Sequence, residues 1–151
     1  MRFVDTNVLL YAASPVSEEP RKRDRALEVL AERELAISVQ VLQEFYHQAT
    51  RVTRRGRLSP ADALDFLEPI LMLRVQAVTP AVFRVGVALS RRFRLSYWDG
   101  AILAAARACD CDVVYSEDLN DGQDYDGLRV INPFREQRTA GGRSTSGERQ
   151  P

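Results

Sequence analysis

Short apolar runs alternate with longer amphipathic stretches along most of the chain, and this alternation restricts the fold more than any other feature. Strands separated by helices pair in parallel, and the helices then cover both faces of the sheet. The sequence therefore predicts an α/β fold with a central, mainly parallel sheet. Strands are predicted at residues 3–4, 35–39, 75–78, 112–115 and 128–131.

Helices are predicted between these strands from apolar residues at helical spacing and from their start signals. Ser59-Pro60 and Thr79-Pro80 each combine a capping hydroxyl with a proline in the first turn. Pro69 is expected to end or kink the helix in which it lies. The predicted helices cover residues 8–13, 21–34, 41–49, 60–67, 80–93 and 100–108.

Length and composition indicate one domain in residues 1–134, followed by a tail in residues 135–151. The tail lacks apolar periodicity and is expected to be disordered. No apolar run is long enough for a membrane span, and we expect no secretory signal. The cysteines, Cys109 and Cys111, are expected to be buried free thiols in a reducing cytoplasm. The net charge of zero does not by itself indicate a nucleic-acid-binding protein.

Four acidic residues occupy comparable places in this predicted arrangement. Asp5 and Asp118 follow strands closely, whereas Glu44 and Asp99 lie near the starts of helices. In a parallel sheet with right-handed crossovers, strand ends and the first turns of the following helices share one edge. The four carboxylates are therefore expected to meet there, and such a cluster requires cations to neutralise it. Oxygen ligands favour hard ions, so Mg²⁺ is the expected occupant and Mn²⁺ a substitute.

Each acid also has an ordinary structural explanation. Asp5 is a good helix cap, and Ser96-x-x-Asp99 has the spacing of a capping box. Glu44 fits a solvated position at the margin of an apolar helix face, and Asp118 belongs to an acidic run that suits a loop. The joint placement of all four acids, rather than any one of them, favours a metal site.

With these residues in view, the sequence resembles the PIN-domain ribonucleases, most closely the VapC-type toxins of bacterial toxin–antitoxin pairs. The resemblance covers residues 2 to about 134, in the order and spacing of the family. It rests on Asp5-Thr6-Asn7-Val8-Leu9, Gln43-Glu44-Phe45-Tyr46, Ser96-Tyr97-Trp98-Asp99-Gly100-Ala101-Ile102 and Ser116-Glu117-Asp118-Leu119.

The resemblance implies a three-layer α/β/α fold and a Mg²⁺-dependent endoribonuclease in the cytoplasm. It also implies a cognate antitoxin protein, and commonly a homodimer. By position, Asp5 and Asp99 would be the principal metal ligands, and Glu44 and Asp118 would complete the catalytic cluster. Further polar groups would orient carboxylates or water, namely Thr6, Asn7 and Ser116. Tyr97-Trp98 and two arginine clusters are candidates to contact phosphates or to stack on unpaired bases of the RNA. The clusters are Arg51, Arg54, Arg55 and Arg57, and Arg91, Arg92 and Arg94.

Alternatives remain open at this point. Asp121, three residues past Asp118, is a second candidate for the fourth acid, although Asp118 is nearer the strand end. A haloacid dehalogenase-type phosphotransferase is disfavoured because Asn7 stands where that family places a second aspartate. A non-catalytic PIN-like module that binds RNA or protein is the main alternative to the enzyme. The RNA target, the number of metal ions and the oligomeric state do not follow from the sequence.

Overall fold

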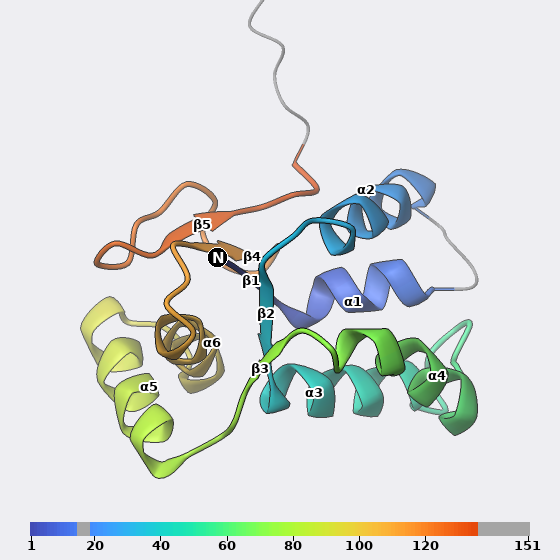
Figure 1. Cartoon of the computed structure of the whole chain (residues 1–151), viewed down its shortest axis with the longest axis horizontal. Coiled ribbons are helices and arrows are strands. Elements are labelled where there is room, and N and C mark those ends of the chain that lie inside the picture. Colours follow the sequence, from blue (N-terminus) through green and yellow to red (C-terminus); the bar gives the residue numbers. More distant parts are fainter. Residues whose placement is uncertain (15–18, 136–151) are drawn as a thin grey trace, which may run out of the picture.

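The structure of the protein, a computed structural model, describes residues 1–14 and 19–135 (Figure 1). Five strands and six helices lie in these residues. The strands are β1 (Arg2–Val4), β2 (Leu35–Ser38), β3 (Arg74–Gln76), β4 (Val113–Tyr115) and β5 (Arg129–Ile131). The helices are α1 (Thr6–Ala13), α2 (Pro20–Leu30), α3 (Val39–Thr50), α4 (Pro60–Ile70), α5 (Pro80–Phe93) and α6 (Tyr97–Ala108).

The strands form one parallel sheet in the order β3-β2-β1-β4-β5. Helices α1 to α4 lie on one side of this sheet, and α5 and α6 lie on the other (Figure 1). This confirms the three-layer α/β/α arrangement. The chain moves outward from β1 to β3 and then returns to β4, so β1 and β4 are neighbours at the point where the strand order reverses. Open α/β sheets bind their ligands at the carboxyl ends of such strands.

All five predicted strands are present, and the differences from the predicted ranges have local causes. Helix α1 begins at Thr6, two residues before its predicted start, because Asp5 caps it. Helix α2 ends at Leu30, and the predicted extension to Glu34 is wrong because Glu34 has a left-handed backbone with φ of 60°. Val39 belongs to α3 rather than β2, because the hydroxyl of Ser38 caps α3.

The start signals of the later helices are confirmed. Ser59 and Thr79 cap α4 and α5, and each is followed by a proline in the first turn. Helix α4 includes Pro69 and extends only to Ile70. Helix α6 begins at Tyr97, three residues before the predicted start, because Ser96 is its cap.

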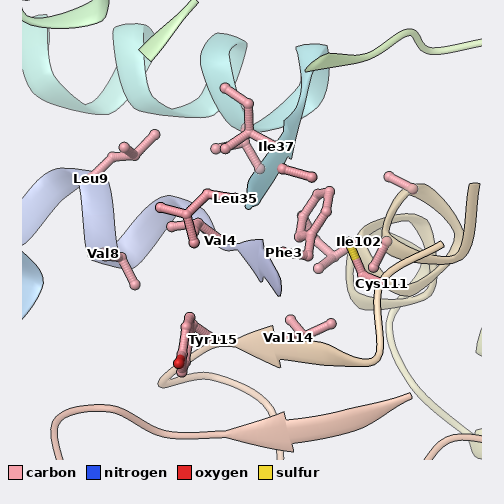
Figure 2. Close-up of a cluster of buried hydrophobic side chains, with 14 of the residues drawn as sticks. Phe3, Val4, Val8, Leu9, Leu35, Ile37, Ile102, Cys111, Val114 and Tyr115 are labelled. Atoms are coloured by element: carbon pink, nitrogen blue, oxygen red, sulfur yellow. The ribbon is translucent and has the colours of Figure 1, made fainter. Parts of the chain in front are cut away.

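The core lies on both faces of the central strands. Residues Phe3 and Val4 of β1 are fully buried. Successive side chains of a strand point to opposite faces. Figure 2 accordingly shows Phe3 beside Ile102 of α6 and Val4 on the side of α1. This two-sided burial fixes the position of β1, and therefore of the residue that follows it.

Three further predictions concern the chain as a whole. The cysteines are buried and free, as predicted, and burial raises the pKa of both thiols. No helix in the described residues is long and apolar enough to span a membrane. The predicted tail, residues 135–151, lies outside the described residues except for Arg135.

Candidate active site

A pocket of about 370 Å³ contains all four predicted carboxylates. It lies where β1 and β4 end, between α3 and α6, so the topology brings together acids that are far apart in the sequence. The lining residues are Asp5, Gln40, Glu44, Trp98, Asp99, Ile102 and Asp118.

Asp5 occupies the deepest position among the four acids, and only 8% of its surface is exposed. Its backbone N–H donates to the carbonyl of Tyr115 (3.0 Å), which extends the pairing of β1 with β4 by one residue. Oδ1 accepts from the backbone N–H of Thr6 (2.7 Å), and Oδ2 accepts from the hydroxyl of Ser116 (2.7 Å). Asp5 is therefore the cap of α1, as its residue type allows, and it also lines the pocket.

Burial is the main reason that the pKa of Asp5 is raised from 3.8 to about 6. The hydrogen bonds from Ser116 and Thr6 act in the opposite direction, because they stabilise the charged form. The negative charges of Asp118 and Glu44 raise the pKa further. A nearby cation would favour the charged form of Asp5 and so offset the effects of burial and of the neighbouring carboxylates.

Glu44 reaches the pocket from α3 and is held by two donors. The hydroxyl of Thr6 donates to Oε2 (3.0 Å), and Nε2 of Gln40 donates to Oε1 (2.9 Å). Gln40, which is buried, also donates to the carbonyl of Trp98 (3.5 Å) and so connects α3 with α6. The sequence reasoning missed Gln40. Its position four residues before Glu44, on the same helix face, was the available signal.

Asp99 takes part in a capping box and also lines the pocket. Its backbone N–H donates to the hydroxyl of Ser96 (3.1 Å), and that hydroxyl donates to Oδ2 of Asp99 (2.8 Å). Ser59 and Asp62 make the same pair of contacts at the start of α4, at 3.1 and 2.6 Å. The two boxes are alike in their local geometry, but only the first faces the four-acid pocket.

Asp118 is the most exposed of the four acids and follows β4. Its backbone N–H donates to the hydroxyl of Ser116 (3.1 Å), and its Oδ2 accepts from the amide of Asn7 (3.3 Å). Asp121 lies elsewhere: its carboxylate accepts from the backbone of Asn132 and from Arg135, both at 2.9 Å. These contacts lower the pKa of Asp121. The geometry thus favours Asp118 as the fourth acid.

Asn7 joins two of the acids, because its Nδ2 contacts Oδ2 of both Asp5 (3.4 Å) and Asp118 (3.3 Å). The opposite orientation of the amide would direct an oxygen at two carboxylates, so the observed one is electrostatically preferred. Its buried Oδ1 has no hydrogen-bond partner within the described part of the chain. Such an oxygen is suited to a buried water molecule.

The donor set fits a hard divalent cation. Among residues 1–14 and 19–135, the lining contains four carboxylates but no lysine or arginine, so no positive side chain of this part of the chain lies in the pocket. Mg²⁺ and Mn²⁺ prefer oxygen ligands of this kind. In residues 1–14 and 19–135, no three acidic, histidine or cysteine side chains are already arranged as a metal site. The carboxylates thus share a pocket without converging on one point.

The loop that carries Asp118 is anchored by its neighbour Glu117. This carboxylate accepts from the hydroxyl of Tyr11 (2.6 Å) and pairs with Lys22 of α2 (2.6 Å). Burial tends to raise the pKa of Glu117, but the contacts with Lys22 and Tyr11 outweigh it and lower that pKa. Lys22 is the only lysine in the chain. Its ion pair connects α2 to the site edge without placing a positive charge in the pocket.

The fold is also found in solved structures of toxin proteins. A toxin–antitoxin complex from Klebsiella pneumoniae has a TM-score of 0.66 at 19% identity, and the match covers 88% of this chain and 98% of that chain. The sarcin–ricin loop cleaving toxin VapC20 of Mycobacterium tuberculosis has a TM-score of 0.62 at 18% identity, with 78% and 90% covered. DNA-bound VapBC from Salmonella typhimurium has a TM-score of 0.59 at 19% identity, with 85% and 95% covered.

At these identities the solved structures establish similarity of fold. A comparison with curated proteins gave no significant match. The PIN-domain family model, however, matches residues 2–123, which include all eleven strands and helices except β5. The matched segment also contains all four carboxylates of the pocket. The chain therefore belongs to the PIN-domain family.

Proposed function

We propose that the protein is a metal-dependent endoribonuclease that acts as the toxin of a toxin–antitoxin pair. The observation that carries this proposal is the pocket at the ends of β1 and β4, where a PIN-domain chain brings four carboxylates together with no lysine or arginine among the lining residues that the structure describes. A site of this charge is suited to binding divalent metal, and a divalent metal is suited to phosphodiester chemistry.

The similar structures support the biological part of the proposal. The Klebsiella protein is described as part of a toxin–antitoxin complex, and the Mycobacterium protein as a toxin that cleaves the sarcin–ricin loop. By analogy, the partners of this chain are an RNA substrate and a cognate antitoxin protein that blocks the pocket. We further propose that the protein acts in the cytoplasm as a homodimer.

Asp5 and Asp99 are the proposed principal ligands of Mg²⁺ or Mn²⁺, and Glu44 and Asp118 complete the set. The bound cation would lower the pKa of a coordinated water and offset the charge of the phosphodiester. Ser116 and Thr6 hold the carboxylates of Asp5 and Glu44 in place by donating hydrogen bonds to them. Such supporting contacts commonly change metal affinity or activity by about 10- to 100-fold.

The exposed carboxylate of Asp118 is the proposed proton acceptor when water attacks the phosphorus of the RNA backbone. One P–O bond of the backbone breaks as the new one forms, and the departing ribose oxygen takes a proton from solvent. Asp118 fits this part because, in the part of the chain that the structure describes, its Oδ2 accepts a hydrogen bond from the amide of Asn7 alone, at 3.3 Å. The oxygens of Asp5 and Glu44, in contrast, are all engaged by donors. A single histidine, His47, leaves no pair of histidines for acid–base catalysis.

The test compares two capping boxes that share their local geometry. Purified protein, free of any partner, is assayed for cleavage of RNA with Mg²⁺ and with a chelator. We expect Asp99→Asn to reduce the rate by at least roughly 100-fold, as expected when a metal ligand is lost. Asp62→Asn removes the matched carboxylate from the start of α4 and should leave the rate nearly unchanged.

The outcomes separate the enzyme from its alternatives. Cleavage that survives both a chelator and the double change Asp5→Ala with Asp99→Ala would refute the proposal. Mg²⁺ binding by calorimetry without cleavage of any RNA would indicate a non-catalytic PIN-like module. Equal effects of Asp99→Asn and Asp62→Asn would mean that Asp99 acts only as the partner of Ser96 in a capping box.

A further inference from the structure

Trp98 is unusually exposed for its residue type. It is the only tryptophan in the chain, and 62% of its surface is accessible although it lines the four-acid pocket. Tryptophan is largely buried on average in folded proteins, because its indole ring is large and mostly apolar. The ring therefore presents apolar surface at the mouth of a pocket whose other exposed groups are mainly carboxylates.

Trp98 is held through its ring and through its backbone. Tyr97 packs against it edge-to-face with a centroid distance of 5.3 Å, and Phe83 of α5 packs against Tyr97 at 5.6 Å. On the backbone side, the carbonyl of Trp98 accepts from Gln40, whose Nε2 also donates to Glu44. The backbone of Trp98 is thus linked to Glu44 through Gln40, and its indole lies against Tyr97 at the edge of the pocket.

We propose that Trp98 forms a stacking site for one unpaired base of single-stranded RNA, next to the phosphodiester that is cleaved. This inference rests on the proposed function, since it requires an RNA phosphate at the carboxylates. Asp99 is the next residue in the chain, so a nucleotide bound there by its phosphate brings its base close to the indole. An unpaired base offers a free π-face to an aromatic side chain, whereas a base inside a duplex does not.

The residues that line the pocket are chemically suited to a nucleotide. Its carboxylates suit a phosphate that is bound through a cation, and Trp98 and Ile102 supply the apolar part. A nucleotide combines the same two properties, a charged phosphate and a flat aromatic base. The site consequently selects RNA that is unpaired at the cleavage position and shows little preference among the four bases, because every base has a π-face.

The sole tryptophan makes the test direct, because all indole fluorescence comes from Trp98. The full-length protein with Mg²⁺ is titrated with a fluorescein-labelled, single-stranded 2′-O-methyl oligonucleotide of mixed sequence. Anisotropy of the label reports binding, and indole emission reports contact with the base. We expect saturable quenching of the emission that follows the anisotropy curve, and weaker binding by roughly 5- to 150-fold for an abasic or duplex oligonucleotide.

A variant series separates stacking from apolar bulk. Trp98→Ala and Trp98→Leu should weaken binding of the oligonucleotide by roughly 5- to 150-fold, and Trp98→Tyr should recover most of the affinity. Mg²⁺ binding measured by calorimetry and the melting temperature should stay close to those of the parent in all three variants. These controls show that neither the fold nor the carboxylates have been disturbed.

Several results would overturn the inference. Binding seen by anisotropy without a change in indole emission would place the base elsewhere and leave the proposed ribonuclease intact. A blue shift of the emission that depends on protein concentration, without RNA, would assign the ring to an interface between two copies. No anisotropy change and no cleavage of natural RNA would refute the stacking site together with the proposed function.

Discussion

At the scale of single residues, the carboxylate of Asp5 both caps α1 and lines the four-acid pocket. Oδ1 caps α1 through the N–H of Thr6, and Oδ2 accepts the hydroxyl of Ser116. Both contacts stabilise the charged form, yet burial dominates and raises the pKa to about 6. An acid that is harder to ionise in the folded protein than in the unfolded chain lowers stability once it is charged. Charged Asp5 therefore lowers the free energy of unfolding, and a bound cation would offset this loss.

Replacing Asp5 by Asn should stabilise the metal-free protein at neutral pH. The interval between 3.8 and about 6 corresponds to about 3 kcal/mol. Because the folded pKa is the higher one, this penalty is absent below about pH 4, grows as pH rises and is complete above about pH 6. With a chelator present, Asp5→Asn is expected to unfold at higher urea concentration than the parent at pH 8. At pH 4 the two proteins should unfold alike.

The control for this measurement is Asp65→Asn, a change at an exposed position of α4. Its effect on the free energy of unfolding should be small and should not vary between pH 4 and pH 8. If Asp5→Asn destabilised the chelated protein equally at both pH values, its hydrogen bonds would outweigh its burial. The proposed electrostatic role of a cation at Asp5 would then lose its support.

At the scale of elements, the crossing of α5 and α6 places Asp99 at the pocket. Gly100, the residue after Asp99, lies directly against Gly86 and Ser90 of α5. A Cβ at Gly100 would lie 2.4 Å from the carbonyl oxygen of Gly86 and 2.9 Å from Cβ of Ser90. The helices approach this closely only because neither Gly86 nor Gly100 has a side chain. The glycine therefore sets the distance at which α6 presents Asp99.

Gly100→Ala should destabilise the protein even though alanine favours a helix by about 1 kcal/mol. Forcing apart two packed helices typically costs about 1–3 kcal/mol, and the contact with the backbone of Gly86 cannot be relieved by a rotamer change. We expect a net loss of stability in urea unfolding and weaker Mg²⁺ binding, because Asp99 moves with α6. Gly86→Ala should cost less, since its Cβ would meet Ala101 at 3.1 Å.

Two results would contradict the prediction for Gly100→Ala. Equal or greater stability of Gly100→Ala would show that α5 shifts without resistance. Unchanged Mg²⁺ affinity despite lower stability would separate the helix crossing from the position of Asp99. Either result would remove the link between this packing contact and the site.

At the scale of the whole molecule, the sequence predicts most of the fold but less of the contacts within the site. The alternation of strands and helices was enough for the parallel sheet, because burial on both faces leaves a strong apolar signal. The convergence of Asp5 and Asp118 also followed from topology alone. The link from Gln40 to Trp98 did not, because it depends on the tertiary distance between α3 and α6. The predicted end of α2 at Glu34 was wrong, because the left-handed backbone of Glu34 has no clear signal in the sequence.

Because the site draws on four distant segments, a bound cation should stabilise the entire domain. A ligand at about 100 times its dissociation constant adds about 2.7 kcal/mol to the free energy of unfolding. For a domain of this size, that gain corresponds to an increase of roughly 5–10 °C in the melting temperature. Mg²⁺ is therefore expected to raise the melting temperature at pH 8 and to lose most of this effect at pH 5. The loss follows because protonation of Asp5, with its pKa of about 6, competes with the metal.

The matched comparison uses Asp99→Asn and Asp62→Asn, which alter equivalent capping boxes. Differential scanning calorimetry with and without Mg²⁺ should give the full increase for Asp62→Asn and little or none for Asp99→Asn. An equal increase in both variants would place the stabilising cation outside the pocket. An increase of the same size at pH 5 and pH 8 would exclude Asp5 from its ligands. Each of the four segments contributes one carboxylate. If the single change Asp99→Asn abolishes the increase in melting temperature caused by Mg²⁺, the four carboxylates act as one site.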